Sequence, residues 1–273
     1  MNTFKRCLLA SCATAMLVSF GAGAASAQDS EQTLRMGTAL GYPPFEYLGP
    51  DGKMTGFEID LGNAICAQLK RRCQWHDTEF SSMVPALKAR KFDAFMASVA
   101  VTEDRMKQVD FSDKVYSSGT RLLARKGANL IAADVMPSAE LLSGKRIGVE
   151  QGTINEKFAK QRWAPLGVQV VSYTDQDLVY SDLVNGRLDG AIVAGIQAQL
   201  GFLSSEQGAG YELVGTPIVD AMIGRSYSAI AVNRGNQALL ADLNRALAAL
   251  RSDGTYQRIA SQYFPASSDI YAE

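Results

Sequence analysis

Short apolar runs alternate with helical patterns along most of this chain, and this alternation limits its possible folds more than any other feature. A first round contains expected strands at 34–38, 74–77 and 93–99 and expected helices at 57–69 and 83–90. A second round contains expected strands at 145–149, 168–173, 189–193 and 211–214 and expected helices at 154–160, 176–184 and 197–203. Strand–helix alternation is typical of α/β folds with mostly parallel sheets. The sequence therefore predicts two α/β units.

The C-terminal part of the chain contains one expected strand, 228–232, and two expected helices, 237–251 and 255–263. These elements are too few to form a domain of their own. We expect them to return to the first unit, so that the chain passes between the two units twice.

The N-terminal segment 1–27 has the pattern of a secretory signal peptide. Lys5 and Arg6 form a basic start, 8–25 is apolar and small, and cleavage after Ala27 fits the small-x-small pattern of signal peptidase. A lipoprotein cleavage site at Cys12 is the alternative, although only a short apolar stretch precedes it. No later apolar run approaches the roughly 18 residues that span a bilayer. We therefore expect an exported protein, located in the periplasm.

Charge and cysteine content exclude several classes of function. The 27 basic and 28 acidic residues form no long block of either sign, so nothing favours binding to nucleic acid. Cys66 and Cys73 are typical of one local disulfide in an exported chain. The alternative is a metal site, but two thiolates and the single histidine, His76, make a poor zinc cage. We expect no metal and no cofactor.

The segment 92–105 ends with a basic residue in an unusual place. Thr102 suits a helix N-cap, because the acids Glu103 and Asp104 follow it and favour a first helical turn. Arg105 then lies in a turn that carries partial positive charge and prefers anions. Its side chain would lean back over the end of the preceding strand, where open α/β sheets bind ligands. Arg105 is thus a candidate ligand-binding residue; the alternative is a solvated arginine balanced by the neighbouring acids.

Short motifs along the expected mature chain carry a family resemblance. They are 41–45 (GYPPF), 56–61 (GFEIDL), the cysteine pair, 102–105 (TEDR), 151–153 (QGT), 176–183 (QDLVYSDL), 186–189 (GRLD) and 253–256 (DGTY). In this order and spacing they resemble the periplasmic substrate-binding proteins of polar amino-acid ABC transporters, solute-binding protein family 3. The lysine/arginine/ornithine-binding and octopine/nopaline-binding branch is the most similar.

The resemblance implies a two-lobed α/β periplasmic binding protein fold, of type II, also called a Venus flytrap. Lobe 1 would comprise 28–117 and 221–273, and lobe 2 would comprise 118–220. Two hinge strands near 117–120 and 220–227 would let the lobes close on a ligand.

The same resemblance implies roles for residues on both lobes. Arg105 would hold a ligand carboxylate through two parallel hydrogen bonds, and Ser98 and the backbone around Ala100 would add donors. Thr153 and Ile154 would contribute backbone N–H groups at a helix N-terminus, where Thr153 is also an ordinary N-cap candidate.

Two aromatic residues, Tyr42 and Phe80, resemble the pair that sandwiches the ligand side chain; either is also compatible with a plain core role.

Three positions depart from the family pattern. Ala194 stands where similar proteins carry the aspartate that pairs with the ligand α-ammonium, Ala100 replaces a hydroxyl, and Ala39 replaces an acid that meets a distal ammonium. Glu150 is the expected substitute acid, with a solvated loop acid as the alternative, and Glu46 and Glu79 are further candidates. The ligand is otherwise not a free α-amino acid.

These observations predict a monomeric receptor that binds a small carboxylated nitrogen compound and delivers it transiently to an inner-membrane ABC permease. The ligand would be a cationic amino acid or a derivative such as an opine. The alternative is an enzyme on the same scaffold, similar to cyclohexadienyl dehydratases, with Glu150 as general acid. A third hypothesis is a sensor domain that transmits a signal to a membrane kinase.

Overall fold

The structure is a computed structural model of the 273-residue chain, and it describes residues 32–223, 227–265 and 270. The expected signal peptide 1–27, its cleavage site and Cys12 lie outside the described residues. Within the described ranges, each helix is too short or too polar to cross a membrane.

The first sheet combines strands from the two ends of the described chain. Its five strands lie in the order β4-β1-β5-β12-β6, with β1 parallel to β4 and β5 and with β12 antiparallel to β5 and β6. The strands are β1 (Gln32–Thr38), β4 (Arg71–Asp77), β5 (Ala94–Phe95), β6 (Val109–Ser117) and β12 (Tyr227–Asn233). A small hairpin of β2 (Tyr47–Leu48) and β3 (Met54–Thr55) lies in the loop after β1.

The second sheet is built from the middle of the chain, in the order β11-β7-β10-β8-β9. Its strands are β7 (Thr120–Arg125), β8 (Arg146–Glu150), β9 (Gln169–Tyr173), β10 (Gly190–Ala194) and β11 (Tyr211–Ile218). The chain passes from the first sheet to the second between β6 and β7, and it returns between β11 and β12.

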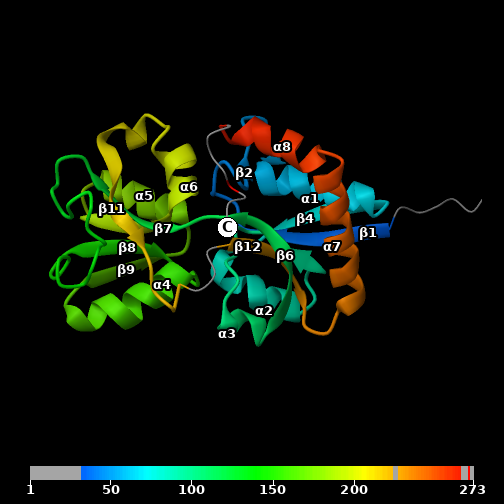
Figure 1. Ribbon diagram of the computed structural model, residues 1–273, viewed down its shortest axis with the longest axis horizontal. Helices are drawn as coiled ribbons and strands as arrows, with labels where there is room; N and C mark the ends of the chain where they lie inside the picture. Colours follow the sequence, from blue (N-terminus) through cyan, green and yellow to red (C-terminus); the bar gives the residue numbers. More distant parts are fainter. Residues whose placement is uncertain (1–31, 224–226, 266–269, 271–273) are drawn as a thin grey trace, which may run out of the picture. The chain divides into compact units, whose positions relative to one another are not determined.

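Helices cover both faces of each sheet. They are α1 (Phe57–Gln68), α2 (Met83–Lys88), α3 (Glu103–Met106), α4 (Ile154–Phe158), α5 (Gln176–Val184), α6 (Gly195–Gln197), α7 (Gln237–Ser252) and α8 (Thr255–Tyr263). In the first sheet, α1, α7 and α8 share a core with Ile230 and Val232, whereas α2 packs with Ala231 on the opposite face (Figure 1). Successive strand residues point to opposite faces, so one strand supplies both cores.

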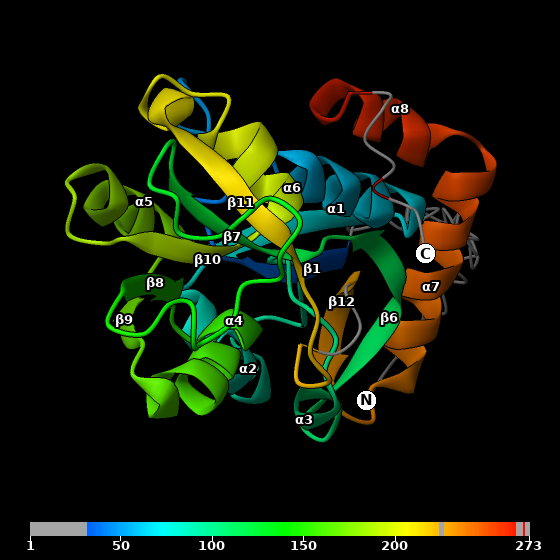
Figure 2. The same cartoon turned by 60° about the vertical axis from the view of Figure 1, so that its left-hand side comes forward.

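The second sheet follows the same rule. Leu122 and Ile192 pack with the α4 side, and Leu123 and Val193 pack with α5 (Figure 2). Sheets that are buried on both faces need apolar residues at successive positions, which explains the continuous apolar runs of the sequence.

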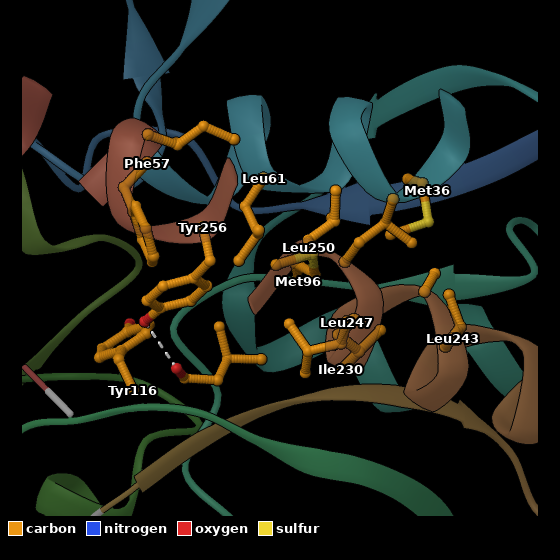
Figure 3. Close-up of a cluster of buried hydrophobic side chains, with 14 of the residues drawn as sticks. Met36, Phe57, Leu61, Met96, Tyr116, Ile230, Leu243, Leu247, Leu250 and Tyr256 are labelled. Carbon is orange, nitrogen blue, oxygen red and sulfur yellow. Dashed lines mark hydrogen bonds between the residues drawn. The ribbon is translucent and has the colours of Figure 1, made fainter. Parts of the chain in front are cut away.

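The main core of the first sheet is an apolar layer between strands and helices. Figure 3 shows Phe57 and Leu61 of α1 and Leu247 of α7 packed with Met36 and Ile230 of the strands. The hydroxyl of Tyr256 donates to the carbonyl oxygen of Val115 at 2.8 Å, so the polar end of this buried ring is satisfied.

The strand expected at 93–99 is shorter than predicted, because only Ala94–Phe95 pair in the sheet. Ser98 adopts a left-handed backbone with φ of 51°, and the Glu58 carboxylate accepts its N–H at 3.0 Å. A residue in this conformation cannot continue a ladder.

Candidate functional site

One cavity of about 850 Å³, a volume that includes space open to solvent, lies where loops of both sheets meet. It brings together residues that follow β1 and β5 of the first sheet and β8, β9 and β10 of the second. All nine predicted ligand-binding residues line this cavity: Tyr42, Phe80, Ser98, Ala100, Arg105, Glu150, Thr153, Ile154 and Ala194.

The N-cap predicted from the sequence places Arg105 at the cavity. The Thr102 hydroxyl oxygen accepts the backbone N–H of Arg105 at 3.3 Å, which starts α3 one residue after Thr102. The Arg105 side chain donates from Nη1 to the carbonyl oxygen of Ala100 at 2.7 Å and from Nη2 to that of Gly152 at 3.0 Å. Two of the five guanidinium N–H groups are engaged in this way, which leaves donors for a ligand.

The surroundings of Arg105 are partly apolar. Its guanidinium carbon lies 5.2 Å from the centre of the Phe80 ring, within range of a cation–π contact. Burial lowers the pKa of Arg105 to about 10, and the Glu150 carboxylate acts in the opposite direction. A cation in such a place is stabilised when an anion joins it.

Thr153 is the N-cap of α4. Its hydroxyl oxygen accepts the N–H of Glu156 at 3.1 Å and donates to the carbonyl oxygen of Glu150 at 2.6 Å. The Glu156 carboxylate also accepts the N–H of Gly152 at 2.8 Å. The Thr153 hydroxyl is therefore engaged within its own turn, so a contribution to a ligand would come from backbone N–H groups.

Glu150 is the last residue of β8, and its side chain lines the cavity. Burial raises its pKa to about 8, and the negative charges of Asp175 and Asp177 add to this shift, while Arg105 opposes it. In the ligand-free site at neutral pH, the carboxyl is therefore mostly protonated. A cationic group placed beside it would favour the ionised form.

A second acid, Glu46, lines the cavity from the loop after β1 and is only 1% exposed. The Ser98 hydroxyl donates to its carboxylate at 3.3 Å. Behind it lies Glu58 of α1, also 1% exposed, which accepts the Ser98 N–H and the hydroxyl of Ser228 at 3.3 Å. The sequence marked Glu46 as a candidate but missed Glu58, whose signal is an acid inside an apolar helix face.

The three alanines at positions that depart from the family pattern all line the cavity: Ala39, Ala100 and Ala194. They leave space where the family pattern would place larger polar side chains. The charged side chains among the described lining residues are Arg105, Glu46 and Glu150.

Sequence reasoning also missed several polar lining residues. Thr120 donates to Asn155 at 3.1 Å, whereas Ser118 Oγ and Gln176 Nε2 are buried without a hydrogen-bond partner. Gln176 directly follows the N-cap Asp175 at the end of β9, and a polar residue at a strand end is a signal that could have found it.

Other contacts join segments of the two sheets near the cavity. Lys157 of α4 forms an ion pair with Asp104 of α3, and Gln197 Nε2 donates to the carbonyl oxygen of Pro43 at 3.2 Å. A Cβ atom added to Gly152 would lie 2.6 Å from Ser81 Cα, so the two segments touch directly at this glycine.

Cys66 and Cys73 form a disulfide, as the sequence predicted, and it joins α1 to β4. Among the described residues, no group of three or more His, Cys, Asp and Glu residues is arranged to hold a metal ion.

Comparison with known proteins decides the family. The profile of the bacterial extracellular solute-binding proteins, family 3, matches residues 34–266. The chain belongs to this family. This match confirms the family predicted from the motifs, and it confirms the two-lobed fold that the family implies.

Individual members of family 3 are similar over almost the whole chain. The lysine/arginine/ornithine-binding periplasmic protein of Escherichia coli strain K12 is 37% identical over 252 residues, which cover 92% of this chain and 95% of that protein. An ancestral arginine-binding protein bound to arginine is 34% identical with a TM-score of 0.78, covering 86% of this chain and 99% of that one. An ancestral amino-acid-binding protein, a precursor of cyclohexadienyl dehydratase, is 28% identical with a TM-score of 0.73, covering 85% and 95%.

Proposed function

We propose that this protein is a periplasmic solute receptor of an ABC importer. It binds a small carboxylated nitrogen compound, a cationic amino acid or a derivative such as an opine, in the cavity that Arg105 lines. The protein acts as a monomer and delivers its ligand to an inner-membrane permease. Similarity to the lysine/arginine/ornithine-binding protein over 92% of the chain supports this role.

The charge pattern of the cavity carries the proposal. One cation, Arg105, and two acids, Glu46 and Glu150, are the charged side chains among its described lining residues. Burial raises the pKa of both acids and lowers that of Arg105. The charged form of each group is therefore disfavoured until a partner of opposite charge joins it. A ligand with one carboxylate and basic nitrogens would supply the missing partners.

Within this proposal, Arg105 binds the ligand carboxylate, and Ser98 and the backbone N–H groups of Thr153 and Ile154 complete its surroundings. Glu150 takes the amine that Ala194 cannot bind. If the amine is substituted, as in an opine, the space beside Ala194 accommodates the substituent.

Tyr42 and Phe80 provide aromatic faces for the ligand stem. Two lobes, 28–117 with 221–273 and 118–220, close on the ligand through the segments that join β6 to β7 and β11 to β12.

A thermal-shift screen of amino acids, opines and guanidino acids tests this function. We expect at least one compound to raise the melting temperature, and isothermal titration of that compound should show a loss of at least about 30-fold in affinity for Arg105→Ala. Arg72→Ala is the matched control, because Arg72 is exposed and does not line the cavity. Unchanged affinity in Arg105→Ala would refute the carboxylate anchor.

A second candidate function rests on the Glu150 carboxyl, whose pKa is about 8. A protonated acid in a buried cavity at neutral pH is suited to general acid catalysis. Incubation with prephenate and arogenate, followed by detection of aromatic product, tests this function. Turnover that disappears in Glu150→Gln would support an enzyme, and stoichiometric binding without turnover would exclude it for these compounds.

A further inference from the structure

Two buried carboxyl groups meet at one serine on the floor of the cavity. Ser98 donates from its hydroxyl to Glu46 at 3.3 Å and from its backbone N–H to Glu58 at 3.0 Å. Both acids are 1% exposed, and neither forms an ion pair within the described residues. Two acids held so close in a buried place cannot both ionise readily.

The groups that face this pair are acidic or neutral. Burial, the charge of Glu58 and the charge of Glu150 raise the pKa of Glu46 well above its ordinary value, against the Ser98 hydrogen bond. Burial likewise raises the pKa of Glu58 to about 7, although hydrogen bonds from Ser98, Ser228 and Tyr116 oppose the shift. The hydroxyls of Tyr42 and Tyr116 are titratable groups that interact electrostatically with both carboxylates, and the charges of the two acids raise the pKa of each hydroxyl. Near neutral pH, the pair therefore retains a proton.

The two acids differ in their access to a ligand. Glu46 lines the cavity, whereas Glu58 does not, so a bound cation can reach only Glu46 directly. The same cavity contains two buried polar atoms without a partner, Ser118 Oγ and Gln176 Nε2, and Gln176 is only 5% exposed. These unpartnered groups indicate that the cavity, which Glu46 also lines, is built to receive a polar ligand.

We propose that ligand uptake is coupled to proton release from the cluster of Glu46, Ser98 and Glu58, the cationic nitrogen of the ligand replacing the proton as the partner of Glu46. The proposal rests on the proposed receptor function and adds its regulation by pH. The O–H bond of the protonated carboxyl breaks, its proton goes to the solvent, and the carboxylate keeps the electron pair and forms an ion pair with the cationic nitrogen of the ligand. Glu58 is a positioning residue, because it fixes the left-handed backbone of Ser98 that presents the hydroxyl to Glu46.

Isothermal titration with L-arginine in buffers of different ionisation enthalpy measures the released protons directly. Glu150 also has a raised pKa, so the decisive comparison is made in the Glu150→Gln background. This variant loses the proposed partner of the ligand amine and should bind L-arginine more weakly, so proton release is compared at saturating L-arginine. There we expect release of up to about one proton per ligand at pH 7, and an affinity that rises up to about tenfold per pH unit between pH 5.5 and 7.5. Adding Glu46→Gln should remove the proton release and lower the affinity for L-arginine at least tenfold.

Two further measurements keep the proposal refutable if Glu46→Gln does not fold. Glu58→Gln, which leaves the cavity lining intact, should reduce proton release while it changes L-arginine affinity less than Glu46→Gln does. L-Citrulline, which is neutral at its distal end, should release fewer protons than L-arginine.

Binding of L-arginine with no proton release in the Glu150→Gln background would overturn the proposal. It would also be overturned if L-arginine, L-lysine and L-ornithine all failed to bind. The receptor function would survive that second result if another carboxylated compound in the thermal-shift screen bound in a manner dependent on Arg105.

Discussion

Arg105 donates a hydrogen bond from Nη2 to the carbonyl oxygen of Gly152, 3.0 Å away, and this bond joins α3 to the turn after β8. The same guanidinium is the only cation among the described residues that line the cavity. Arg105 thus holds the two sides of the site together and faces the space for a ligand. Ligand binding and the approach of the two sides are therefore expected to depend on one side chain.

Replacing Arg105 with lysine separates geometry from charge. Lysine keeps the positive charge but cannot form two parallel hydrogen bonds to a carboxylate. We expect Arg105→Lys to weaken binding of the ligand found by the screen about 10- to 100-fold, the worth of one charged hydrogen bond. Isothermal titration measures the change, with Arg72→Lys as the control. Equal affinity of both variants would contradict bidentate binding.

Gly152 tests how closely the two sides must approach. It has a positive φ of 76°, and an added Cβ atom would lie 2.6 Å from Ser81 Cα. Gly152→Ala should therefore lower ligand affinity about tenfold or more, because the added Cβ atom would push apart the two segments that touch at this glycine. Gly186→Ala is a matched control: its φ is 71°, but no atom lies within 4 Å of the added Cβ.

Both glycine variants should lose roughly 1–2 kcal/mol of folding stability through backbone strain, measured by urea denaturation. Only Gly152→Ala should lose affinity. Similar affinity losses in the two variants would mean that strain, and not the contact with Ser81, controls binding.

The pH dependence of the ligand-free protein follows from its raised acid pKa values. The pKa of Glu150 is about 8 and that of Glu58 about 7, both above the ordinary 4.5. A raised pKa in the folded state contributes stability that is complete below pH 4.5 and is lost as the pH rises to about 8. The melting temperature of the ligand-free protein should therefore fall between pH 5 and pH 8.5 through these groups.

Glu150→Gln should make the melting temperature fall less steeply with pH, since the variant has one fewer acid with a raised pKa. Glu156→Gln is the comparator with the opposite sign, because Lys160 and the Gly152 N–H lower the pKa of Glu156 despite partial burial. Removing the Glu156 carboxyl should change the melting temperature by a similar amount at every pH above 5, so the slope of melting temperature against pH should stay the same. An unaltered slope in Glu150→Gln would show that this acid does not titrate in the range.

The sequence predicted the position of Arg105 in its helix from neighbouring residues, but it did not predict contacts between residues far apart in the chain. The N-cap at Thr102 depends only on residues within one turn, and the predicted helices 176–184 and 255–263 have the bounds of α5 and α8. Glu58 could not be assigned in this way. An acid inside an apolar helix face is its only local signal, and its partner Ser98 lies 40 residues away, so the sequence does not show what this acid contacts.

Backbone irregularities were also unpredictable. The sequence predicts one continuous helix at 154–160, but a π-helical turn, Ala159–Trp163, follows α4, and another, Ala198–Phe202, follows α6. Such turns are rare, and each of these two ends at a large buried side chain, Trp163 or Phe202, that packs in a core of the second sheet. The resemblance, not periodicity, identified the cavity residues of the second sheet.

The disulfide between Cys66 and Cys73 should contribute stability without contributing to binding. It closes a loop with a sequence separation of 7, and a loop of that size corresponds to about 2–3 kcal/mol in the chain-entropy model. Neither cysteine lines the cavity. Reduction should therefore lower the unfolding free energy by that amount, measured by urea denaturation with and without reductant, and should leave ligand affinity within about threefold.

The double variant Cys66→Ala/Cys73→Ala provides the control, because its stability should not respond to reductant. It should also be less stable than the reduced protein, since Cys66 is 2% exposed and packs in the main core, where truncation leaves a small void. A reductant effect of equal size in the double variant would show that the change arises elsewhere. A large loss of affinity on reduction would instead show that the α1–β4 connection controls the cavity, through Glu58 of the same helix.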